Sequence, residues 1–207
     1  GPHLTGRHGQ LVAQILGPAA LVGVREAASH TIALRLGAPA DRLAHTIDDA
    51  AHLDFATVSD PIPAGPYIAA TFAPHAGLAY LKSLIESAAA LFDDLAELTH
   101  WRIVLVPHES GGMDSQRIDD VAVHNAIANS VSKAKVNVLD TVTARYAAKI
   151  VAGARLVLST RYHPVVFAMA NGVPAIGICV DGYTSNKIRG ALENYGCAAL
   201  AVSVASL

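Results

Sequence analysis

The sequence alternates short runs of β-branched residues with longer stretches in which apolar residues recur about every 3.6 positions. This alternation is typical of consecutive βαβ units, and it predicts an α/β fold with parallel sheets. We expect strands at residues 21–24, 43–46, 67–72, 102–106, 135–139, 155–158, 174–178 and 198–202. The clearest helices are expected at residues 78–98, 115–131, 142–152, 164–170 and 185–195.

A proline-rich segment divides this pattern into two parts. Residues 59–66 hold three prolines and one glycine, which disfavour both a helix and a central strand. We interpret the segment as an interdomain linker and place the boundary between residues 1–60 and residues 61–207. In residues 61–207, each expected strand except the last is followed by a helix, which is the pattern of a complete domain. Residues 1–60 have too few strands to close a sheet, so we interpret them as the end of a domain whose beginning is absent.

The composition excludes several classes of protein. Of the 207 residues, 52% are hydrophobic and 15% are charged, which is enough apolar material for a large buried core. The formal net charge is -2 and no basic stripe is present, so we expect no nucleic acid partner. The most apolar stretch is interrupted by Asn171-Gly172-Val173-Pro174, so we expect no transmembrane segment. Two cysteines are too few for a disulfide scaffold, which fits a cytoplasmic protein.

Polar residues gather where the expected strands end. Ligands of parallel sheets bind just beyond the carboxyl ends of the strands. Three histidines follow such ends, His75, His108 and His163, together with Arg161 and Asp140. The sequence therefore predicts a binding site along this edge of the sheet.

The strongest candidate is the segment Ser159-Thr160-Arg161-Tyr162-His163-Pro164. Proline is favoured in the first turn of a helix, so the residues before Pro164 would surround a helix N-terminus, with its free N–H groups and partial positive charge. Arg161 offers a planar fork for a carboxylate or phosphate, and His163 can bind an anion or move a proton. The alternative is that Arg161 pairs with a structural carboxylate and His163 only caps the helix. Spacing alone does not separate the two.

Arg25 is the second candidate, because it ends an expected strand and begins a helix at the edge of its own sheet. Its alternative is a surface pair with Glu26 or a helix cap. The sequence has no Gly-x-Gly-x-x-Gly, Walker, Gly-x-Ser-x-Gly or His-Glu-x-x-His motif. Dinucleotide-binding, P-loop, hydrolase and zincin functions therefore lack their key residues.

Two blocks of residues resemble the polysaccharide pyruvyl transferase family, and they occur in the order that the family has. The first block comprises Val24-Arg25-Glu26, Ser29, Leu34, Gly37, Asp48-Asp49-Ala50 and Leu53. The second comprises Ser159-Thr160-Arg161-Tyr162-His163 and Gly172-Val173-Pro174-Ala175-Ile176. The resemblance implies a GT-B-like fold, in which two Rossmann-like domains with parallel sheets face each other across a cleft. It also implies that residues 1–60 end the amino-terminal, acceptor-side domain and that residues 61–207 form the donor-binding domain.

The resemblance further implies a reaction. Members of the family transfer a pyruvyl group from phosphoenolpyruvate to two hydroxyls of a sugar, leaving a cyclic ketal and phosphate. The implied acceptor is a saccharide or lipid-linked glycan of polysaccharide biosynthesis for the cell envelope. We expect neither a cofactor nor a metal, with phosphoenolpyruvate as the donor substrate. We expect a cytoplasmic enzyme that can associate with the inner face of the membrane, and a homo-oligomer is compatible with the family.

Site residues follow from the resemblance position by position. Arg161 and His163 match the family's donor-binding arginine and histidine, and Arg25 matches the arginine from the other domain. Lys187, with Asn186 before it, resembles a recurrent lysine. The expected substrate-binding set is completed by Ser159, His108 and His75, the last standing where many members carry a polar residue or arginine.

We hypothesise that Arg25, Arg161 and the helix N-terminus hold the anionic groups of the donor while His163 protonates its methylene carbon. The ordinary pKa of histidine, roughly 6.5, and nearby anions would favour this role. His108 or Asp140 is the candidate base. Two alternatives stay open: a GT-B glycosyltransferase that uses a nucleotide-sugar, and a non-catalytic glycan-related binding domain.

Overall fold

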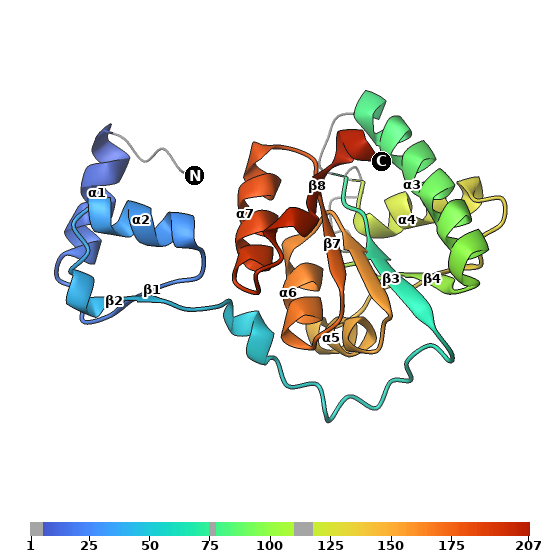
Figure 1. Ribbon diagram of the computed structural model, residues 1–207, viewed down its shortest axis with the longest axis horizontal. Coiled ribbons are helices and arrows are strands. Elements are labelled where there is room, and N and C mark those ends of the chain that lie inside the picture. Colours follow the sequence, from blue (N-terminus) through green and yellow to red (C-terminus); the bar gives the residue numbers. More distant parts are fainter. Residues whose placement is uncertain (1–5, 75–77, 110–117) are drawn as a thin grey trace.

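The computed structural model describes residues 6–74, 78–109 and 118–207, and it contains two parallel sheets (Figure 1). The small sheet pairs β1 (Val22–Val24) with β2 (Leu43–His45). The large sheet has the strand order β5-β4-β3-β6-β7-β8, and every neighbouring pair is parallel. Its strands are β3 (Tyr67–Thr71), β4 (Arg102–Leu105), β5 (Val136–Val138), β6 (Leu156–Ser159), β7 (Ala175–Cys179) and β8 (Ala201–Ser203). The predicted α/β fold with parallel sheets is confirmed, and it is consistent with a Rossmann-like architecture.

Helices accompany both sheets. The small sheet is joined by α1 (Gly6–Leu16) and α2 (Ala27–Arg35). The large sheet is covered by α3 (Leu78–Thr99), α4 (Asp120–Ser130), α5 (Ala144–Ala152), α6 (Tyr162–Ala170) and α7 (Gly182–Glu193). Short 3-10 turns are η1 (Ala40–Arg42), η2 (Asp49–His52), η3 (Ala198–Leu200) and η4 (Val204–Ser206). No helix within the described residues combines the length and the apolarity needed to cross a bilayer.

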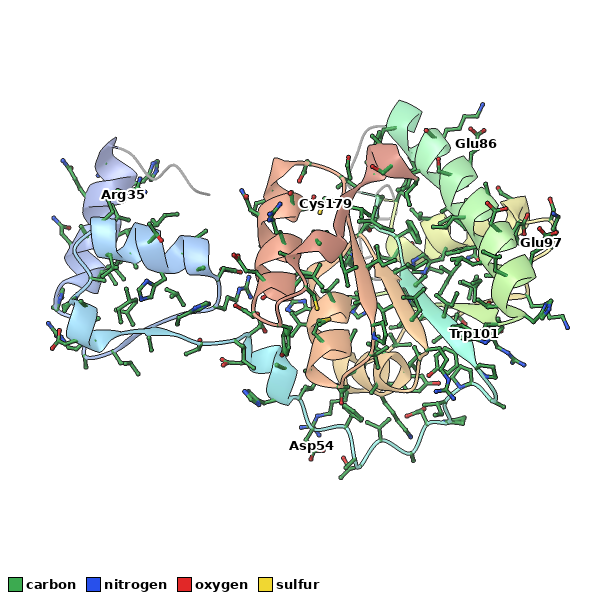
Figure 2. The ribbon with its side chains drawn as sticks, in the orientation of Figure 1. Arg35, Asp54, Glu86, Glu97, Trp101 and Cys179 are labelled. Carbon is green, nitrogen blue, oxygen red and sulfur yellow. The ribbon has the colours of Figure 1, made fainter. Side chains whose placement is uncertain are left out.

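The inner strands β3, β6 and β7 of the large sheet are largely buried on both faces, because successive side chains point to opposite sides and helices cover each side. Tyr67 and Ala69 of β3 belong to a core with α5, α6 and α7, whereas Ile68 and Ala70 belong to a second core with α3 and α4. Apolar side chains fill the space between the sheet and both helical layers (Figure 2). This double burial explains why the strands read as continuous apolar runs.

The segment between the two sheets, residues 46–66, runs along the base of the large sheet (Figure 1); we call it the connecting segment. Its apolar residues pack on the core around α5 and α6, namely Ala50, Ala51, Leu53 and Phe55. The Lys149 ammonium donates to the carbonyl oxygens of Val58 and Asp60 at 2.6 and 2.7 Å. The proline-rich stretch has no regular secondary structure, as predicted, but α5 holds it in place.

Several helices begin at other residues than the sequence predicts. α6 begins at Tyr162 and not at residue 164, because proline is tolerated throughout the first helical turn. α7 begins at Gly182 because the Asp181 side chain and Thr184 form a reciprocal capping box. α4 begins at Asp120 with Asp119 as its N-cap, and the start predicted for it at residue 115 lies outside the described residues. Tyr162 and His163 therefore stand on a helix and not in a loop.

The end of β1 docks directly on α7. The Asn194 side-chain amide donates to the Arg25 carbonyl oxygen at 2.8 Å. At Gly190, an added Cβ would lie 2.7 Å from the Cγ of Glu26, so only glycine allows this approach. These contacts bring Arg25 to the carboxyl edge of the large sheet.

A second glycine yields a stability test. A Cβ at Gly177 of β7 would lie 2.1 Å from the Cγ2 of Ile188 on α7. Gly177→Ala should therefore lower the free energy of unfolding in urea by about 1–3 kcal/mol, because strand and helix must move apart. Gly182→Ala is the control, since its added Cβ would meet no atom within 4 Å. Equal stability of the two variants would show that α7 does not pack so closely on β7.

Candidate functional site

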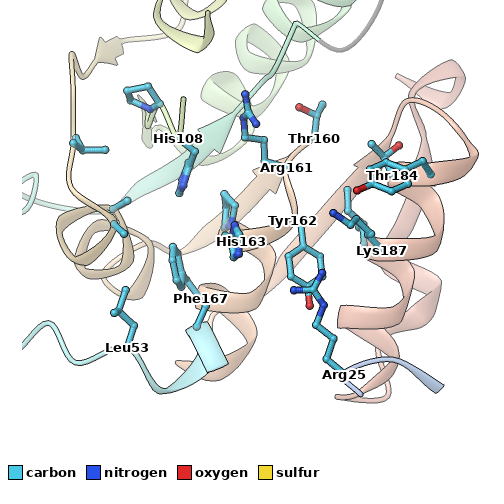
Figure 3. A pocket seen from close by; sticks show the side chains of 18 residues that line it. Arg25, Leu53, His108, Thr160, Arg161, Tyr162, His163, Phe167, Thr184 and Lys187 are labelled. Atoms are coloured by element: carbon cyan, nitrogen blue, oxygen red, sulfur yellow. The ribbon is translucent and has the colours of Figure 1, made fainter. Parts of the chain in front are cut away.

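A cavity of about 520 Å³ lies beyond the carboxyl ends of β4, β6 and β7 (Figure 3). The strand order of the large sheet reverses between β3 and β6, and β6 leads directly into the cavity wall at Thr160. This is the place where open parallel sheets bind ligands. Figure 3 shows Arg25 and Lys187 on one side of the cavity and Leu53 and Phe167 on the other. The apolar lining residues are Ala50, Leu53, Val142, Ala144, Ala147 and Phe167.

Five of the residues predicted for the site line this one cavity: Arg25, His108, Arg161, His163 and Lys187. They come from the end of β1, the loop after β4, the start of α6 and the middle of α7. The topology therefore gathers residues that are far apart in the sequence.

The other predicted residues lie elsewhere. Ser159 is buried, and its hydroxyl accepts from the Arg161 N–H and donates to the Arg161 carbonyl, both at 2.9 Å, so it shapes the turn before α6. Asn186 and Asp140 are exposed and are not among the residues that line the cavity. His75 lies outside the described residues.

Arg161 is held by carboxylates. Its Nε and Nη2 donate to the two oxygens of Asp120 at 2.8 and 2.7 Å, and Nη2 also donates to Glu109 at 2.8 Å. Asp120 is fully buried and accepts as well from the backbone N–H groups of His108 and Glu109. The structure thus shows the alternative for Arg161, a pair with a structural carboxylate, although the side chain also lines the cavity.

This ion pair fixes the two imidazoles of the site relative to each other. Asp120 binds the loop that carries His108, and Arg161 is the N-cap of the helix that carries His163. Both imidazoles pack on the ring of Phe167, with ring centroids 6.1 and 6.2 Å apart. The result is a continuous aromatic wall.

The two imidazoles lose water to different extents, since His108 Nε2 is buried whereas His163 is exposed. Burial lowers the pKa of His108 to about 3, and His108 Nε2 has no hydrogen-bond partner among the described residues. Partial loss of water also lowers the pKa of His163, and Arg25, Lys187 and Arg161 lower it further, while Asp48 opposes them. In the protein by itself the pKa of His163 therefore lies below its usual value, and protonation of His163 beside an anionic ligand stays a prediction.

Arg25 is held from three sides. Its Nε donates to Glu26 at 2.9 Å, its Nη1 donates to Asp48, and its Cζ lies 4.5 Å from the centre of the Tyr162 ring. Burial alone would raise the pKa of Asp48, but the N–H of Ala50 and the Arg25 guanidinium hold that pKa below its usual range. The pair with Glu26 that was the alternative for Arg25 is present, and the guanidinium still lines the cavity.

Lys187 is held differently. Its Nζ lies 4.5 Å from the ring centre of Tyr183 and 6.0 Å from that of Tyr162. Among the residues that the structure describes, it has no ion pair. The first turn of α6 lies beside it, and the N-cap Arg161 makes no side-chain bond to that turn. Lys187 and the α6 N-terminus are therefore open to an anion.

Sequence reasoning missed three residues of the site. Asp120 follows Asp119 at a helix start, and the N-cap preference of aspartate was a usable signal for it. Tyr162 and Tyr183 gave no comparable signal, because ring positions depend on where α6 and α7 begin. Within residues 6–74, 78–109 and 118–207, no group of three or more potential metal ligands is placed to hold an ion.

A family model for polysaccharide pyruvyl transferase matches residues 1–181. The chain belongs to the polysaccharide pyruvyl transferase family. The match supports a transferase enzyme, and it includes four of the five cavity residues above, whereas Lys187 lies beyond it. A search of curated proteins finds no match. In this pyruvyl transferase family member, the matched region thus supplies most of the cavity wall.

The Arg161–Asp120 pair yields a second prediction. Asp120→Asn should lower the free energy of unfolding by about 3 kcal/mol, because it leaves a largely buried guanidinium without its main counter-charge. The control is Glu97→Gln, which breaks the exposed pair with Lys133 on the outer surface of α3 (Figure 2) and should change stability little. Similar urea midpoints for the two variants would contradict a structural role for Asp120.

A third prediction concerns pH. His124 is fully buried, its Nε2 accepts from the Phe72 N–H at 3.0 Å, and burial lowers its pKa from 6.5 to about 4. Below pH 6.5 the unfolded chain binds a proton that the folded protein does not take up until about pH 4, so stability falls as the pH falls through this window. His124 alone should cost about 2 kcal/mol by pH 5.

His124→Gln keeps an acceptor for the Phe72 N–H but does not titrate. Urea unfolding at several pH values should show a smaller loss of stability between pH 7 and pH 5 in this variant than in the wild type. An unchanged loss would mean that the imidazole is not buried in its neutral form.

Proposed function

We propose that this protein transfers a pyruvyl group from phosphoenolpyruvate to two hydroxyls of a sugar, forming a pyruvate ketal and releasing phosphate. The observation that carries the proposal is the match to the pyruvyl transferase family together with one cavity that holds Arg25, Lys187 and His163. Phosphoenolpyruvate has a carboxylate and a phosphate close together, and such a donor needs several positive groups in a small space.

We assign the binding of these anionic groups to Lys187, Arg25 and the N-terminal N–H groups of α6. Lys187 and the α6 N-terminus support this assignment best, because neither has an anionic partner among the described residues. Arg161 keeps Asp120 and Glu109 as partners. We propose that Arg161 adds positive charge near the N-terminus of α6 and holds His163 in position.

In the proposed mechanism, His163 is the general acid. A bound dianionic donor would raise the pKa of His163, since it would reverse the balance of charge around the ring. Protonation of the methylene carbon forms the methyl group and leaves an oxocarbenium-like centre, which one sugar hydroxyl attacks. The bond to phosphate then breaks, and the second hydroxyl closes the ketal. Of the two hydroxyl protons, one balances the proton that entered the methyl group and the other leaves with phosphate.

The base in this scheme is His108. Its Nε2 is unpartnered among the described residues, and its ring packs on Phe167 as that of His163 does. The low pKa of His108 in the protein by itself means that this role requires a bound anionic donor to raise it. Asp140, the other candidate, is exposed and does not line the cavity. The apolar side near Leu53 and Phe167 leaves room for an acceptor beside a donor as small as phosphoenolpyruvate.

The proposal also covers the domain organisation and the acceptor. Residues 1–60 would belong to the acceptor-side Rossmann-like domain and residues 61–207 would form the donor-side domain of a GT-B-like fold. The acceptor would be a saccharide or lipid-linked glycan made in the cytoplasm for the cell envelope. Arg25 at the end of β1 supports this, because the first part of the chain then supplies one wall of the site.

The test separates binding from chemistry. Lys187→Met should weaken phosphoenolpyruvate binding about 10–100-fold, measured by the ligand-dependent rise in melting temperature. His163→Gln should keep that binding but release phosphate at least about 100-fold more slowly with a glycan acceptor, because the proton donor is lost.

Lys82→Met is the matched control, since Lys82 is an exposed lysine that pairs with Glu86 on α3. It should bind and turn over phosphoenolpyruvate as the wild type does. Stabilisation by a uridine diphosphate sugar and not by phosphoenolpyruvate would contradict the proposed donor.

A further inference from the structure

One aromatic ring lies beside two of the three cations that line the cavity, Arg25 and Lys187. Tyr162, on the first turn of α6, lies with its ring centre 4.5 Å from the Arg25 guanidinium carbon and 6.0 Å from the Lys187 ammonium (Figure 3). The ring is buried, and it also meets the His163 imidazole edge to face at 5.4 Å. Arg25 comes from β1 and Lys187 from α7, so α6 supplies the surface on which two distant elements meet.

The contacts of Arg25 show what the ring adds. Two carboxylates, Glu26 and Asp48, bind the edge of the guanidinium through Nε and Nη1. Edge contacts alone leave the plane of the group free to tilt. A ring under Cζ supplies the face contact that fixes the tilt, and such cation–π contacts are favoured for arginine over aromatic rings.

The contacts of Lys187 show why an aromatic partner suits this site. A carboxylate would hold the ammonium in place but would also cancel its charge. The rings of Tyr162 and Tyr183 attract the ammonium through their quadrupoles and carry no net charge. The positive charge of Lys187 is then still available to an anionic ligand.

We propose that Tyr162 is a positioning residue whose ring, and not its hydroxyl, orients Arg25 and Lys187 for an anionic ligand. The orientation of Arg25 stands on the contacts of the protein alone. The link to ligand affinity rests on the proposed function, in which that ligand is phosphoenolpyruvate. The hydroxyl of Tyr162 makes no well-formed hydrogen bond among the described residues, although the Asp48 carboxylate lies near it, so the proposal rests on the ring contacts with Arg25 and Lys187.

The first test compares Tyr162→Phe with Tyr162→Leu. The phenylalanine variant keeps the ring and should bind phosphoenolpyruvate within about 3-fold of the wild type, whereas the leucine variant should bind about 10-fold more weakly. KM for phosphoenolpyruvate should rise with little change in kcat. Tyr146→Leu on α5 is the matched control, because it removes a tyrosine that bonds to Pro61 and does not line the cavity. Equal losses in the Phe and Leu variants would overturn the proposal.

A second readout does not depend on the ligand. In a double-mutant cycle of Tyr162→Leu and Arg25→Met, the destabilisations in urea should be less than additive, because each change removes the same contact. Additive effects would overturn the proposal. If wild-type protein binds no phosphoenolpyruvate, the proposed function fails, and this cycle alone decides whether the ring holds Arg25.

Phenylalanines with one to three ring fluorines at position 162 cover the case in which the leucine variant does not fold. They keep the shape of the ring while withdrawing electron density from its face. Progressive loss of the coupling to Arg25 with each fluorine is expected. A coupling that is independent of fluorination would show that the ring acts by shape alone and would overturn the cation–π assignment.

Discussion

The site depends on the ion pair between Arg161 and Asp120. A carboxylate that is fully buried is costly unless hydrogen bonds replace its lost water, and from the described residues Asp120 accepts four such bonds, two from Arg161 and two from backbone N–H groups. The pair joins the loop after β4, the start of α4 and the start of α6. Because the loop after β4 and the start of α6 both line the cavity, a single interaction with the start of α4 fixes the spacing of His108 and His163.

The fold could be predicted because its signals are local. A strand buried on both faces must be largely apolar, and β3 is buried over its whole length, with the Thr71 hydroxyl hydrogen-bonded to the Val106 carbonyl. The helices repeat their apolar positions at a different period, so the order of strands and helices can be read along the chain. Binding at the carboxyl ends follows from this order, which is why His108, Arg161 and His163 could be assigned to one edge, whereas Lys187 was predicted only from the family resemblance.

The partners within the site could not be predicted in the same way. Arg161 and Asp120 lie 41 positions apart, and their contact requires α4 to begin at Asp120. A start at residue 115 would have placed that carboxylate on a later turn. The aromatic surface of Tyr162 likewise requires α6 to begin two residues before the predicted start. Sequence patterns locate helices more reliably than their first residues, and in this protein the chemistry lies at those first residues.

The connecting segment has a consequence for how the two parts of the chain interact. Ala50 and Leu53 of this segment line the cavity, and Asp48 holds Arg25 over a ring of the large unit. A ligand that touches Arg25 on one side and Lys187 on the other would therefore bridge both parts. The two effects are thermodynamically linked: if docking of the small sheet on the large one strengthens ligand binding, the bound ligand stabilises that docking by the same free energy.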